Sequence, residues 1–154
     1  MIKRKCVYFK QPRPIPEEAT AYHGITDEMC KNMGVKPEPV LQEFLEDCRM
    51  VGAMVAHNAD FDFGVIEANM RRFKVTDEFQ VPIICTMQES EPILELPTRI
   101  QNKAFKAPKL DDLMEYLFIS PGLSVQFDRH DAQVDTAITA RCFMELKRRG
   151  HISL

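Results

Sequence analysis

The chain has 154 residues, of which 45% are hydrophobic and 28% charged, and its formal net charge is −3 at pH 7. This length suits one domain with a hydrophobic core, and the composition excludes a disordered or fibrous protein. No apolar run approaches the ~20 residues of a transmembrane helix, and the basic residues 1–5 do not begin a signal peptide, so no membrane partner is expected. The negative net charge argues against a broad basic surface for nucleic acid, but not against an enzyme that holds one strand end through metal ions.

The cysteines predict a reducing environment. Their number is odd and no two are spaced as Cys-x-x-Cys, which argues against a disulfide framework or a thiolate zinc site. The cytoplasm is therefore the expected compartment. Each of the five is expected to be a small buried hydrophobic residue: Cys6, Cys30, Cys48, Cys85 and Cys142.

The first half of the chain predicts one strand followed by helices. Residues 6–9 are typical of a strand that ends at a proline cluster. Residues 16–20 resemble the first turn of a short helix, and Thr26 is a suitable N-cap for a second helix that ends near Gly34. The apolar spacing then predicts an amphipathic helix over 39–49.

The second half alternates strands and helices. Residues 51–56 form an apolar run too short for a helix, which suits a parallel strand buried on both faces. The remaining expected elements are a helix over 59–73, a strand over 81–86, a long loop over 89–108, a helix over 110–117 and a last helix over 130–150. Strands separated by helices indicate a single α/β domain over residues 1–154 with parallel pairing.

Two clusters of polar residues could carry chemistry. Residues 57–62, HNADFD, directly follow the apolar strand over 51–56. In parallel α/β sheets, ligands bind at the carboxyl ends of the strands. Two carboxylates there either face solvent or bind a metal ion, and helix capping by Asn58 or Asp60 is the alternative.

The second cluster is residues 130–135, HDAQVD. His130 and Asp135 share a site only if His130 lies at or before the first helical turn, because positions five apart on a helix lie about 140° apart. The alternative is a capping Asp131 with His130 facing solvent.

These clusters belong to a wider pattern. Residues 13–29, which include the run HGIT at 23–26, resemble the DEDDh, or DnaQ-like, family of 3′–5′ exonucleases. This family includes the proofreading subunit of bacterial replicative DNA polymerase. Asp62 matches its second acidic motif, residues 109–113 (KLDDL) resemble its Lys-Leu-x-x-Leu helix start, and the pair His130 and Asp135 matches its third motif. The matches occur in family order along nearly the whole chain.

The resemblance implies a ribonuclease H-like mixed sheet flanked by helices and hydrolysis of phosphodiester bonds with two divalent cations, Mg²⁺ or Mn²⁺. It implies that Asp62 and Asp135 hold the metal ions, Asp62 partly through water, and that His130 is the general base. Contacts to the substrate are expected from His57, Asn58 and Phe61. The expected substrate is the 3′ end of single-stranded DNA, with RNA as the alternative.

The chain departs from the family in one respect. The family opens with a strand carrying Asp-x-Glu, and no such motif occurs here, so the sheet is expected to lack its first strands. Loss of those carboxylates predicts weaker metal binding and impaired hydrolysis. Three explanations are open: an upstream segment that is missing, a strand supplied by a DNA polymerase subunit or a second copy, or a catalytically inactive module that binds nucleic acid or a polymerase.

Overall fold

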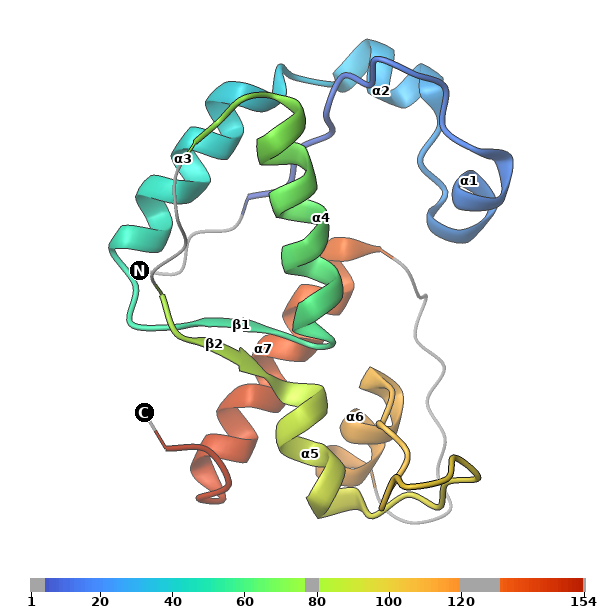
Figure 1. Cartoon of the computed structure of the whole chain (residues 1–154), viewed down its shortest axis with the longest axis vertical. Coiled ribbons are helices and arrows are strands. Elements are labelled where there is room, and N and C mark those ends of the chain that lie inside the picture. Colours follow the sequence, from blue (N-terminus) through green and yellow to red (C-terminus); the bar gives the residue numbers. More distant parts are fainter. Residues whose placement is uncertain (1–4, 77–80, 120–130, 154) are drawn as a thin grey trace.

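The computed structural model describes residues 5–76, 81–119 and 131–153 of the chain. Figure 1 shows α1 and α2 at one end of the long axis and α5 and α6 at the other, with β1, β2 and α4 between them. The helices and strands in this part of the chain are, in order, α1 (Glu17–His23), α2 (Asp27–Met33), α3 (Pro37–Arg49), β1 (Met54–Ala56), α4 (Ala59–Arg72), β2 (Ile83–Cys85), α5 (Thr86–Leu94), α6 (Leu110–Phe118) and α7 (Ala132–Arg148).

The predicted first strand over 6–9 is reduced to a single bridge. Phe9 pairs with Val35 in parallel orientation, and the backbone bonds there run from Lys10 N to the Val35 carbonyl (3.0 Å) and from Val35 N to the Tyr8 carbonyl (2.8 Å). No other strand among the described residues pairs with this segment. A segment with strand propensity forms a strand only where a neighbouring strand pairs with it. The predicted strand is therefore longer than the pairing observed.

The two strands form a small parallel sheet. Met54 pairs with Ile83 and Ala56 with Cys85, as the βαβ connection through α4 requires. This confirms the α/β class and the parallel pairing. The strands are shorter than predicted and not buried on both faces, because all three β1 residues are only half-buried and Ile83 is 46% exposed.

The predicted loop over 89–108 is wrong in its first part, because α5 continues to Leu94. Pro92 lies inside this helix, where it lacks an N–H group, and the helix ends two residues later. Ile93 and Leu94 pack against the core of α6 and α7, and this burial outweighs the proline. Proline and charge patterns alone do not reveal that contact.

Most of the hydrophobic core lies between α6 and α7. The apolar positions recur at helical spacing on both helices, and Leu113, Cys142 and Leu146 have no solvent exposure. A separate, smaller cluster joins α3 and α4 through Leu41, Leu45 and Met70. The first cluster therefore stabilises the C-terminal helices, and the second stabilises the packing of α3 against α4.

The described cysteines are all free, and four of the five are buried. Burial raises the pKa of the Cys142 thiol to about 11, so it stays protonated at neutral pH. This confirms the interpretation of Cys30, Cys48, Cys85 and Cys142 as small hydrophobic residues. Cys6 is exposed, contrary to the prediction.

Two apolar side chains just before β1 are exposed. Met50 is 78% and Val51 47% exposed. None of the helices in the described ranges has the length and apolar character needed to cross a membrane.

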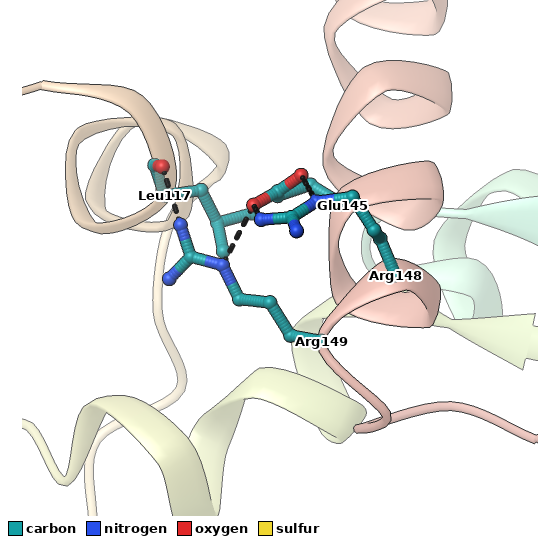
Figure 2. Close-up of polar contacts among 4 residues, drawn as sticks. All are labelled: Leu117, Glu145, Arg148 and Arg149. Atoms are coloured by element: carbon teal, nitrogen blue, oxygen red, sulfur yellow. Dashed lines mark hydrogen bonds and ion pairs between the residues drawn. The ribbon is translucent and has the colours of Figure 1, made fainter.

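The end of α7 is held by a carboxylate between two guanidinium groups (Figure 2). Glu145 accepts hydrogen bonds from Arg148 (2.7 Å to each carboxylate oxygen) and from Arg149 Nε (2.8 Å). Arg149 also donates to the Leu117 carbonyl at 2.7 Å, which joins α7 to the end of α6. The bonds from Arg148 and Arg149 lower the pKa of Glu145 to about 2.

The substitution Glu145→Gln is expected to lower the melting temperature by a few degrees at neutral pH. A carboxyl group whose pKa is depressed on folding stabilises the protein above its ordinary pKa of 4.5, and this stabilisation is lost as the pH falls toward about 2. The difference between the variant and the wild type should therefore close between these pH values in thermal melts. A difference that is constant across this range would show that the pairing does not form in solution.

Candidate functional site

The start of α4 places Asp62 beside the sheet. Asn58, at the N-cap, takes a left-handed conformation (φ 67°) that asparagine tolerates, and it makes no side-chain capping bond. Ala59 N donates to Cys85 Sγ at 3.4 Å, which ties the first turn of α4 to the end of β2. Asp62 lies three residues farther along, in the same first turn. The predicted capping by Asn58 through its side chain is therefore not observed.

The start of α7 places Asp135. Asp131 is its N-cap, and the Asp131 carboxylate accepts from Gln133 N (2.7 Å) and Val134 N (3.4 Å). Asp135 follows in the first turn and is half-buried. Its Oδ1 atom is buried and has no hydrogen-bond partner within the described residues. Such an atom costs free energy unless a ligand satisfies it.

The structure brings Asp62 and Asp135 together, although 73 positions separate them in the sequence. Although the Asp62 side chain is exposed, partial desolvation raises the pKa of its carboxyl, and the nearby charge of Asp135 raises it further. Both effects disfavour the ionised form of Asp62, and a cation bound between the two carboxylates would offset their negative charge. The oxygen donors and the unpartnered Asp135 Oδ1 thus fit a hard divalent cation. Within the described ranges no group of three potential metal ligands occurs, so a cation held by Asp62 and Asp135 would need further oxygen ligands.

His57 follows β1 and has both ring nitrogens in contact with the chain. Nδ1 lies 3.0 Å from Thr86 Oγ1 and Nε2 lies 3.1 Å from the Pro108 carbonyl oxygen. A carbonyl oxygen only accepts, so Nε2 carries the proton in this bond. The Thr86 hydroxyl is also within 3.2 Å of the Ala56 carbonyl. His57 thereby joins the end of β1 to the start of α5 and to the segment before α6.

The other predicted residues lie as follows. Phe61 projects from the first turn of α4 and is 66% exposed, and Asn58 is exposed beside it. His130 lies outside the described residues, so the structure gives no geometry between His130 and Asp135. His23 accepts a hydrogen bond from Ile25 N at 3.0 Å.

Sequence reasoning missed two members of this region. Thr86 is fully buried, and its hydroxyl contacts His57. A threonine directly after an apolar strand was the available signal. No pattern of side chains in the sequence indicates a role for the Pro108 carbonyl. It reaches His57 because of the position of α6, which begins at the predicted residue.

A parallel βαβ unit with two neighbouring aspartates on the first turns of two helices defines an acidic α/β site. A family model described as "Exonuclease" matches residues 2–143. The chain therefore belongs to this exonuclease family, which confirms its resemblance to the DnaQ-like exonucleases.

The chain is also similar to three named relatives. It is 43% identical over 76 residues to the DNA polymerase III PolC-type of Streptococcus pneumoniae strain D39. It is 44% identical over 77 residues to that of Streptococcus thermophilus strain LMD-9 and 41% over 76 residues to that of Streptococcus sanguinis strain SK36. Each match covers 49% of this chain and 5% of the relative, so the chain matches only a small part of these proteins.

Proposed function

We propose that the chain is a metal-dependent 3′–5′ exonuclease domain that removes nucleotides from the 3′ end of single-stranded DNA. The observation that carries this proposal is the proximity of Asp62 to the charge of Asp135, with the buried Oδ1 of Asp135 lacking a hydrogen-bond partner among the described residues. The family membership supports a nuclease, and the PolC-type relatives support a role beside a replicative polymerase. A ribonuclease H-like sheet and a cytoplasmic location belong to the same proposal.

The roles follow from chemistry and position. Asp62 and Asp135 would hold Mg²⁺ or Mn²⁺, which when bound activates water and neutralises charge on the scissile phosphate. His130 would take the proton of the attacking water, a task that suits an imidazole near neutral pH. Exposed Phe61 offers a surface on which a base can stack, and Asn58 offers polar contacts. Because both its ring nitrogens contact the chain, His57 would contribute to substrate binding by positioning this loop.

A module that binds nucleic acid ends or a polymerase without hydrolysis is the second candidate. The observation that favours it is that only two carboxylates meet in the described part of the site, whereas divalent cations take six or more oxygen ligands. The two candidates share the same surface and differ in whether a bond is broken.

One experiment separates them. The chain is incubated with a single-stranded DNA oligonucleotide labelled at its 5′ end, in Mg²⁺ or Mn²⁺, with a parallel RNA arm. A ladder that shortens from the 3′ end and disappears with a chelator is the expected result. Binding of the oligonucleotide without any ladder would contradict the exonuclease proposal and support the second candidate. A ladder that persists in chelator would contradict the metal dependence.

A further inference from the structure

A pocket lies apart from the acidic pair, and neither Asp62 nor Asp135 lines it. It has a volume of about 400 Å³ and lies between the proline-rich segment before α1 and the helix α2. The segment contributes Lys10 and Arg13, and α2 contributes Lys31. Three cations from two segments about 20 residues apart therefore line one pocket, in a chain whose net charge is −3.

Backbone contacts hold the proline-rich segment against α2. Lys10 N donates to the Val35 carbonyl, and Ile15 N donates to Asp27 Oδ1 at 2.9 Å, so the segment is bonded on both sides of Arg13. Gly34 permits this approach, because a Cβ atom there would lie 2.9 Å from Lys10 N and 2.0 Å from the Cys30 carbonyl oxygen. The prolines at 12 and 14 restrict the backbone between these bonds. The fold thus sets the backbone positions that carry the three cations, and the side chains themselves are exposed.

The charge of the pocket is unbalanced. Asp27 is the carboxylate that lines it, and its Oδ1 is occupied by the bond from Ile15 N. None of the three cations forms an ion pair with a carboxylate of the described residues, whereas Lys5 nearby pairs with Glu43. Three like charges in one pocket repel each other, and a polyanion would relieve that repulsion.

We propose that Lys10, Arg13 and Lys31 form a binding site for phosphodiester groups of the single-stranded nucleic acid, separate from the acidic pair. An arginine side chain suits bidentate contact with phosphate, and lysines supply point charges. This inference rests on the proposed function for its choice of ligand. The pocket would hold the strand through its backbone and without sequence preference, while the acidic pair acts on the 3′ end.

The test is a binding measurement without metal, so that no hydrolysis takes place. Fluorescence anisotropy follows a labelled oligothymidylate about 20 nucleotides long, an ample length for several backbone contacts. The combined variant Lys10→Gln, Arg13→Gln and Lys31→Gln is expected to weaken binding about tenfold. The slope of log Kd against log salt should fall by about 2, since each single-strand phosphate contact contributes about 0.7.

Two controls define the result. Lys147→Gln removes an exposed cation from the far end of α7 and should leave the salt slope within experimental error. Arg13→Lys keeps the charge and should retain most of the affinity. Unchanged affinity and slope in the combined variant, with an unchanged melting temperature, would overturn the proposal.

The source of the phosphate is tested separately with inorganic pyrophosphate in a calorimeter. Pyrophosphate binding that the combined variant abolishes, together with unchanged oligonucleotide binding, would overturn the nucleic-acid assignment in favour of a small-anion site. Failure of the exonuclease proposal has a different signature, because the wild-type chain would then bind the oligonucleotide through this pocket and produce no ladder in Mg²⁺ or Mn²⁺.

Discussion

The substitution Asp135→Asn is expected to reduce hydrolysis at least 100-fold and to leave the chain as stable as the wild type or more stable. A group that only orients a metal ligand typically contributes 10–100-fold, so loss of a direct ligand should exceed that. The gain in stability has an electrostatic cause, because Asp135 raises the pKa of Asp62 and its removal relieves that repulsion.

The pH dependence follows from the sign of the Asp62 shift. A carboxyl group with a raised pKa is destabilising once the pH rises above its ordinary value of 3.8, because the folded state resists losing the proton. The stability gain of Asp135→Asn should therefore be present at neutral pH and absent below about pH 3.8, where Asp62 is protonated in folded and unfolded states. Thermal melts across this range measure it.

The matched control is Asp60→Asn. Asp60 lies in the same first turn of α4 as Asp62 and is exposed, as Asp62 is, but it does not match the acidic motif of the family. This variant should hydrolyse the oligonucleotide at close to the wild-type rate. Mg²⁺ should raise the melting temperature of the wild type and of Asp60→Asn, but not of Asp135→Asn. Turnover by Asp135→Asn above a tenth of the wild-type rate would show that the site has been placed wrongly.

The second large effect is expected in the core. Leu146→Ala should lower the free energy of unfolding by about 3–4 kcal/mol, because Leu146 has no solvent exposure and packs in the core between α6 and α7. For a chain of this size the melting temperature should fall by about 10 °C. Denaturant unfolding measures the change directly.

The control for this variant lies on the same helix. Met144 is 63% exposed, so Met144→Ala should change the free energy of unfolding by less than about 0.5 kcal/mol. Leu146 is about 16 Å along α7 from Asp135, so hydrolysis per folded molecule should be retained in Leu146→Ala. A loss of less than 1 kcal/mol would mean that α6 and α7 do not pack in solution as described.

The sequence by itself determined much of the local structure. Helical spacing of apolar residues predicted α3, α4, α6 and α7, because an amphipathic helix needs only a repeating pattern and suitable ends. Asp131 is an example of a suitable helix end, because its capping bonds are local and the sequence offered this capping role. The motifs at Asp62 and Asp135 indicated the family, which the match over residues 2–143 confirmed.

The tertiary structure alone decided what depends on distant partners. The strand pattern over 6–9 became a single bridge because no second neighbour pairs with it in the described chain. The helix α5, which the sequence did not predict, occupies the start of the expected loop over 89–108, because Ile93 and Leu94 pack against the core of α6 and α7. The buried Oδ1 of Asp135, the contacts of His57 with Thr86 and Pro108, and the pocket of Lys10, Arg13 and Lys31 all join residues from separate segments. Burial and charge proximity are properties of the folded chain, and no spacing rule along the sequence reports them.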